Sequence, residues 1–114
     1  MKLKELKMKI CVSAMSGSLD AKVSERFGRA PYFVIVESDD MSFVPALNAA
    51  ESMQGGAGPE AVRQVAAQGA QVVLTGELGP NAKTAIAVAG IKGVTGVSGS
   101  ITVRQAVEEY LSKK

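Results

Sequence analysis

Two extended apolar segments in the first half of the chain are joined by a very short link. Residues 32–37 (YFVIVE) form a continuous apolar run, and a second segment covers residues 42–47. Parallel neighbours in a sheet need a crossover of about a dozen residues or more, which this link cannot supply. The two segments are therefore expected to form an antiparallel hairpin. Pro45 has no N–H to donate, which places the second segment at an edge of the sheet.

Buried strands and helices alternate through the rest of the chain. The apolar pattern of residues 8–14 predicts a first strand buried on both faces. One helical turn is expected at residues 20–26. After the hairpin the expected helices cover residues 59–69 and 80–90, with a third beginning at 100–102, and further strands cover 71–75 and 91–97. Pro59 and Gly69 suit the start and end of the first helix, and Thr102 and Gln105 have the spacing of a capping box.

These elements predict a three-layer α/β/α domain. Right-handed crossovers and a meander of the first three strands give a five-stranded mixed sheet of order 3-2-1-4-5, with strand 2 antiparallel. The length of 114 residues suits one hydrophobic core. We expect a basic leader at residues 1–7 and a single domain at 8–114, with translation starting at Met1 or Met8.

The composition excludes several kinds of chemistry. One cysteine and no histidine rule out an intramolecular disulfide, a Cys/His zinc site and every histidine-based triad. Residues 8–14 carry no acid, which argues against nuclease activity with two metal ions. Basic residues concentrate at the two ends, so no basic stripe for nucleic acid is expected. No membrane span or signal peptide is visible, and a cytoplasmic protein without enzymatic activity is expected.

Five segments should meet at one edge of the sheet, and three of them lead into helices. They cover residues 15–18, 26–29, 55–58, 76–80 and 98–100. Helix N-termini carry free N–H groups that favour anions, and glycine lets a ligand approach the backbone. Neither a Walker motif nor a dinucleotide fingerprint is present. The segments predict a cleft for an anionic ligand. The candidate ligand-binding residues are Ser13, Met15, Ser16, Gly17, Arg26, Phe27, Gly28, Gly55, Gly56, Gly58, Gly76, Gly79, Ser98, Gly99 and Ser100.

Four motifs carry a family resemblance: RFGRAPYF at 26–33, GGAG at 55–58, TGELGPNA at 75–82 and GVSGSITVRQAVEEYL at 96–111. Their order and spacing resemble the accessory proteins of nitrogenase iron–molybdenum cofactor biosynthesis. The resemblance implies a ribonuclease-H-like fold and the binding or carriage of a molybdenum- or iron–sulfur cluster or its precursors. Members commonly read His-Phe-Gly where this chain has Arg26-Phe27-Gly28. Arginine cannot ligate a metal, but it can pair with an anionic cluster.

Two soft side chains are weak candidates for metal ligation. Cys11 falls in the middle of a predicted strand and is expected to pack in the core, whereas Met15 follows that strand near the glycine-rich edge. The preferred hypothesis is a carrier of an anionic metal–sulfur cluster. The alternatives are a sensor of a small anion or nucleotide, and a ligand-free module that docks a redox or cofactor-assembly partner.

Overall fold

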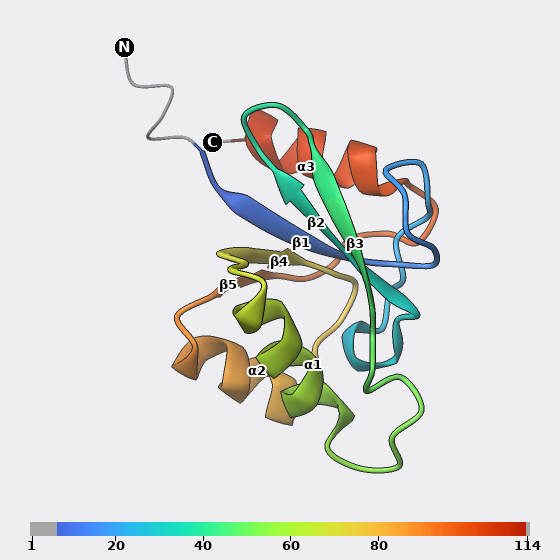
Figure 1. Ribbon diagram of the computed structural model, residues 1–114, viewed down its shortest axis with the longest axis vertical. Helices are drawn as coiled ribbons and strands as arrows, with labels where there is room; N and C mark the ends of the chain where they lie inside the picture. The colour runs from blue at the N-terminus through green and yellow to red at the C-terminus, as the bar shows by residue number, and fades with distance from the viewer. Residues whose placement is uncertain (1–6, 114) are drawn as a thin grey trace.

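A five-stranded mixed sheet runs through the centre of the protein (Figure 1). The computed structural model describes residues 7–113, so residues 1–6 of the predicted leader lie outside it. The sheet has the order β3-β2-β1-β4-β5. β2 is antiparallel to both its neighbours, and β1, β4 and β5 are parallel, which confirms the predicted topology. The strands are β1 (Lys9–Ala14), β2 (Tyr32–Glu37), β3 (Phe43–Leu47), β4 (Val72–Leu74) and β5 (Lys92–Val94).

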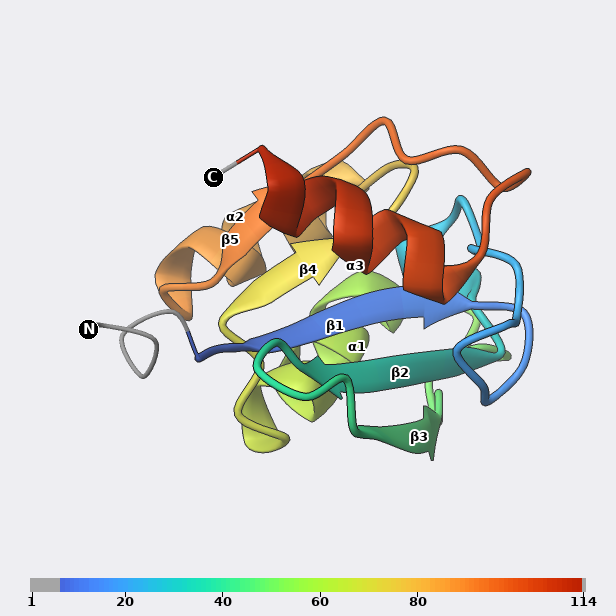
Figure 2. The same ribbon diagram turned by 90° about the horizontal axis from the view of Figure 1, so that it is seen from above.

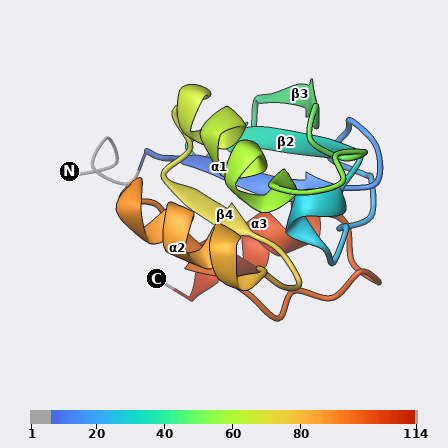
Figure 3. The same cartoon turned by 90° about the horizontal axis from the view of Figure 1, so that it is seen from below.

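Three helices cover the two faces of this sheet. α3 (Val103–Ser112) lies across one face (Figure 2). α1 (Ala57–Ala67) and α2 (Pro80–Val88) lie together on the other face (Figure 3). β1 is buried on both sides because Val12 packs toward α3 and Cys11 toward α1 and α2. No helix within residues 7–113 is long and apolar enough to cross a bilayer.

Pro45 lies in the edge strand, as predicted. It stands opposite Val34. Three positions further along the same ladder, Asn48 N donates a hydrogen bond to Pro31 O at 3.0 Å. Hydrogen-bonded pairs alternate along an antiparallel ladder. Counted from Asn48, every second residue of β3 is hydrogen-bonded to β2, and Pro45 falls between two such residues. The nitrogen of Pro45 therefore faces away from β2. The missing donor therefore costs the sheet no internal hydrogen bond.

The segment between β1 and β2 differs from the prediction. The helical turn expected at residues 20–26 is absent, because Val23 N donates to Ile101 O at 3.0 Å and Lys22 bridges to Thr102. A short 3₁₀ helix, η2 (Phe27–Arg29), follows instead. These contacts join residues about eighty positions apart, which local sequence does not reveal.

Most predicted boundaries are wrong by one to three residues. α1 begins at Ala57 instead of Pro59, because Gly56 adopts a left-handed conformation (φ 75°) and starts the helix. β5 ends at Val94 instead of residue 97, since Gly96 also has a positive φ and its N–H donates to Gly76 O at 2.8 Å. The capping box is confirmed: the Thr102 hydroxyl accepts from Gln105 N, and the Gln105 side chain accepts from Thr102 N.

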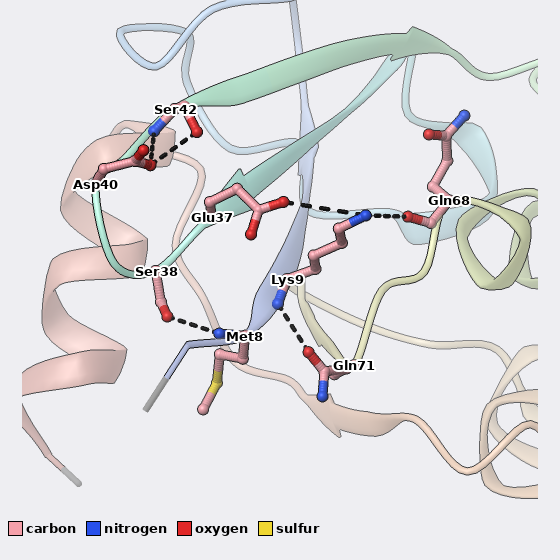
Figure 4. Close-up of polar contacts among 8 residues, drawn as sticks. All are labelled: Met8, Lys9, Glu37, Ser38, Asp40, Ser42, Gln68 and Gln71. Carbon is pink, nitrogen blue, oxygen red and sulfur yellow. Dashed lines mark hydrogen bonds and ion pairs between the residues drawn. The ribbon is translucent and has the colours of Figure 1, made fainter. Parts of the chain in front are cut away.

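Polar contacts fasten the start of β1 to its neighbours (Figure 4). Met8 N donates to the Ser38 hydroxyl at 2.8 Å, and Lys9 N donates to the Gln71 side chain at 3.0 Å. The Lys9 ammonium lies 4.0 Å from the Glu37 carboxylate. This end of the sheet is thus closed by the protein's own side chains, at the opposite end of β1 from Ala14 and the glycine-rich loops.

Candidate functional site

A pocket of about 330 Å³ lies between η2 and the first turns of α1 and α2. We call it the α1–α2 pocket. It is lined by three of the five predicted segments, those at 26–29, 55–58 and 76–80. Figure 3 shows η2 next to α1. The predicted site residues brought together here are Arg26, Phe27, Gly28, Gly55, Gly56, Gly58 and Gly79, joined by Arg29, Gln54, Ala57, Pro59, Glu77, Pro80, Asn81 and Ala82.

Two glycines allow the walls of the α1–α2 pocket to approach closely. A Cβ on Gly28 would lie 3.3 Å from the nitrogen of Gly58, and one on Gly58 would lie 2.9 Å from the Cβ of Ala82. Carbon atoms prefer separations of about 3.5–4.0 Å. A side chain at Gly58 would therefore force α1 and α2 apart and change the shape of the pocket.

Both helix N-termini at the pocket lack a side-chain cap. The N-cap residues are Gly56 for α1 and Gly79 for α2, and neither offers a side-chain acceptor. First-turn N–H groups have no acceptor within their own helix, and they carry partial positive charge. Since Pro59 and Pro80 have no N–H, the available donors include those of Gly58 and Asn81. Two such termini facing one cavity favour an anion.

The two arginines of the pocket differ in what they bind. Arg29 donates from Nη1 to the carbonyl oxygens of Glu51 (2.9 Å) and Met53 (2.5 Å), which fastens the loop before α1. Arg26 is exposed, and its guanidinium forms no hydrogen bond or ion pair with any residue of 7–113. Arg26 therefore remains available for charge-assisted contact with a ligand.

The pocket lacks the side chains needed to coordinate a metal. Glu77 is its only carboxylate, and no group of three His, Cys, Asp or Glu side chains suited to a metal exists in the described part of the chain. Glu77 is fixed through its backbone: its N–H donates to Glu25 O at 2.7 Å, and its carbonyl accepts from Phe27 N at 3.3 Å. The arrangement can hold an anion through N–H groups and positive charge.

The site residues predicted at the end of β1 and in the loop after it do not line the α1–α2 pocket. Ser13 is fully buried, with its hydroxyl 2.6 Å from Ser24 O and 2.7 Å from the Thr75 hydroxyl. A Cβ on Gly17 would lie 2.8 Å from the Cβ of Pro45, so this loop packs over β2 and β3. Met15 and Ser16 are exposed and do not line the α1–α2 pocket.

The predicted segment before α3 is occupied by a side chain of the protein itself. The carboxylate of Glu25 accepts a hydrogen bond from Gly99 N at 2.6 Å, and the hydroxyls of Ser98 and Ser100 are 2.7 Å apart. Gly76 lies against the backbone of Glu25, because a Cβ on Gly76 would be 2.5 Å from Glu25 O. These four predicted residues are not brought to the α1–α2 pocket.

Cys11 is completely buried between the sheet and the α1–α2 layer. Burial strongly raises the pKa of its thiol above the ordinary value, so it stays protonated and is a poor metal ligand. Its placement in the core agrees with the preferred sequence interpretation.

Sequence reasoning missed two amide side chains that line the pocket, Gln54 and Asn81. Asn81 had a usable signal, because Pro80 at a helix start places the next residue in the first turn. Gln54 follows an irregular segment and had none.

Comparison with known proteins gives a consistent picture. The apo form of the orange protein from Desulfovibrio gigas is 41% identical, with a TM-score of 0.89 over 93% of this chain and 88% of that one. A NifB-like protein of the DUF35 family from Thermotoga is 25% identical, with a TM-score of 0.79 over 92% and 88%. No curated protein matches the chain.

A more distant structure shares the fold alone. It is described as a candidate dinitrogenase of Methanocaldococcus jannaschii, is 13% identical, and has a TM-score of 0.65 over 94% of this chain and 90% of that one. The family model for the dinitrogenase iron-molybdenum cofactor matches residues 8–113. Because this match covers nearly the whole chain, the protein belongs to the dinitrogenase iron–molybdenum cofactor family.

Proposed function

We propose that this protein is a non-catalytic carrier of an anionic metal–sulfur cluster, or of a precursor of one, bound in the α1–α2 pocket. The observation that carries the proposal is the convergence of two uncapped helix N-termini and the unpaired Arg26 on one cavity. Family membership supports the class of cargo, because the family is linked to the iron–molybdenum cofactor. The relative from Desulfovibrio gigas was solved in an apo form, which implies a form with something bound.

The chemistry of the pocket limits the kind of cargo. With no cysteine or histidine in its lining, the pocket supplies hydrogen bonds and charge rather than coordination bonds. A suitable cargo therefore has its metal ions already saturated by sulfide or oxide and carries net negative charge. Its terminal sulfides or oxygens would accept hydrogen bonds from the N–H groups of Gly58 and Asn81 and from Arg26.

The first test uses protein purified without oxygen. We expect visible absorption and bound metal after reconstitution with iron, sulfide and molybdate, and we expect tetrathiomolybdate to bind more tightly than molybdate. Colourless, metal-free protein after reconstitution would refute the cluster proposal. Binding of phosphate or a nucleotide in preference to either molybdenum anion would favour a small-anion sensor, and absence of any binding would favour a docking module for a partner protein.

Arg26 provides the decisive variants. Arg26→Ala should weaken binding of tetrathiomolybdate about tenfold or more, because it removes a charge-assisted contact. The matched control is Arg104→Ala, which removes an exposed arginine from α3, where it pairs with Asp20 at 3.4 Å. The control should leave affinity within about twofold at moderate salt. Equal losses in both variants would mean that net charge, and not this pocket, governs binding.

The family residue offers a second comparison. Arg26→His removes most of the positive charge at neutral pH and supplies a nitrogen that can ligate a metal. We expect it to weaken molybdate binding as Arg26→Ala does while increasing retention of a reconstituted cluster, because the imidazole nitrogen can replace a terminal sulfide or oxide on one of its metal ions. If the His and Ala variants retain equally little cluster, a nitrogen ligand at this position does not hold the cargo, and the role of the family histidine does not carry over to this pocket.

A further inference from the structure

Asn48 connects the two walls of the α1–α2 pocket without lining it. It follows directly after β3 and is buried, with 6% of its surface exposed. Its side-chain nitrogen donates to Gly28 O at 3.1 Å and Ala30 O at 2.9 Å, which are the carbonyls of the η2 wall. Its side-chain oxygen accepts from Ala50 N at 2.9 Å and from the Gln64 side chain, on α1, at 3.0 Å.

These four bonds use the full capacity of the amide, which has two donor hydrogens and two acceptor lone pairs. Gln64 completes the connection, because its own oxygen accepts from Ala49 N at 3.0 Å. One side chain thus joins η2, the loop that leads to Gly55, and α1. Aspartate and alanine could not make the same bonds, because aspartate lacks the donors and alanine lacks both donors and acceptors.

The connection matters because η2 and α1 are in close contact at the pocket. A Cβ on Gly28 would lie only 3.3 Å from Gly58 N, a donor proposed to face the ligand. A shift of η2 by a few tenths of an ångström would therefore change where Arg26 lies relative to that donor. Hydrogen bonds to an anion weaken quickly as distance and angle depart from ideal.

We infer that Asn48 is a positioning residue for anion binding in the α1–α2 pocket: it fixes the spacing between the Arg26 wall and the N-terminus of α1. The inference rests on the proposed function, since the pocket must bind an anion for its spacing to affect affinity. Asn48 acts through Gly28 and Gln64 and touches no ligand itself.

The test separates positioning from simple stability. Asn48→Ala is compared with Val107→Ala, which opens a cavity in the layer between α3 and β1, on the other side of the sheet. Two quantities are measured at a temperature where every variant is folded: molybdate affinity by calorimetry, and hydrogen exchange at residues 27–30 without any anion. Gln64→Ala is a milder second variant, which decides the matter if Asn48→Ala does not fold.

We expect Asn48→Ala to weaken molybdate binding about tenfold and to accelerate exchange at residues 27–30. Gln64→Ala should shift both quantities in the same direction by less. Val107→Ala should leave affinity within about twofold, even where it lowers the melting temperature as much. The inference is overturned if Asn48→Ala matches Val107→Ala in both quantities. If wild-type protein binds no molybdate or tetrathiomolybdate, the proposed function fails, and the exchange comparison alone decides whether Asn48 positions η2.

Discussion

Ser13→Ala should destabilise the protein strongly and leave anion affinity unchanged. Ser13 has one hydroxyl hydrogen and two close oxygens, Ser24 O at 2.6 Å and the Thr75 hydroxyl at 2.7 Å. A carbonyl can only accept, so Ser13 donates to Ser24 O and Thr75 donates to Ser13. Removing the Ser13 hydroxyl leaves a buried carbonyl and a buried hydroxyl without partners. At about 1–3 kcal/mol for each of these two groups, the expected loss of unfolding free energy is roughly 2–6 kcal/mol.

Because of the direction of these bonds, the two single substitutions of a double-mutant cycle, Ser13→Ala and Thr75→Val, should cost different amounts of unfolding free energy. Thr75→Val removes the hydroxyl that donates to Ser13 but leaves Ser13 bonded to Ser24 O. It should therefore lower the unfolding free energy by only about 1 kcal/mol. The double variant should cost less than the two single changes together, by about 1 kcal/mol or more, because it removes the orphaned Thr75 hydroxyl. Urea unfolding followed by circular dichroism measures each free energy of unfolding.

An exposed serine in the loop that follows β1 supplies the control. Ser16→Ala should change the free energy of unfolding by less than about 0.5 kcal/mol. Calorimetry with tetrathiomolybdate gives the affinity of each variant. The reasoning would be refuted if Ser13→Ala weakened anion binding while its unfolding free energy stayed at the wild-type value. That result would return Ser13 to the binding site in which the sequence analysis placed it.

Val107→Asp should lower the melting temperature by more than about 10 °C, because it buries an unpaired carboxylate between α3 and β1; an unchanged melting curve would show that this face of α3 is not buried in solution. Burial raises the pKa of the Cys11 thiol, so above the ordinary thiol pKa of 9.0 the thiol ionises in the unfolded chain but not in the folded protein. The free energy of unfolding should therefore fall by up to about 1.4 kcal/mol for each pH unit above that value. Cys11→Ala should abolish that part of the slope, and identical slopes would contradict it. Glu77→Gln should raise tetrathiomolybdate affinity about two- to fivefold at low salt, with the gain shrinking as salt increases, whereas Glu108→Gln on α3 should not. Amides of β1 and β4 should exchange more slowly with solvent than those of β3, and equal protection in all strands would contradict the edge position of Pro45.

Local patterns were sufficient to predict the sheet order. The short link between residues 37 and 42 required a hairpin, and the helices between later strands required parallel crossovers. The positions where the sequence analysis failed depend on distant partners. The segment at 20–26 looked like a helical turn, but the chain before α3 supplies the acceptor for Val23 N. No periodicity within the segment contains that information.

The candidate site was predicted only in part, because some of its predicted residues are positioned by partners far away in the sequence. The segments containing Arg26, Gly58 and Gly79 do converge. The strand order alone places the start of β2 and the N-termini of α1 and α2 at the same end of the sheet. The segment at 98–100 does not, since the Glu25 carboxylate reaches Gly99 from 74 positions away. Asn48 escaped attention altogether, because an asparagine after a strand normally indicates only a turn.

Pro45 also affects how the protein behaves at high concentration. An exposed edge strand offers a row of N–H groups with which a strand of another molecule can pair. Val44 and Leu47, which are 54% and 70% exposed, add apolar surface that favours such association at β3. The ring of Pro45 interrupts that row at its centre, on the side that faces away from β2. A docking strand would find a carbonyl without its neighbouring donor, which makes growth of an intermolecular sheet from β3 unfavourable. Replacing Pro45 with threonine would complete the row and turn the same edge into a template for aggregation.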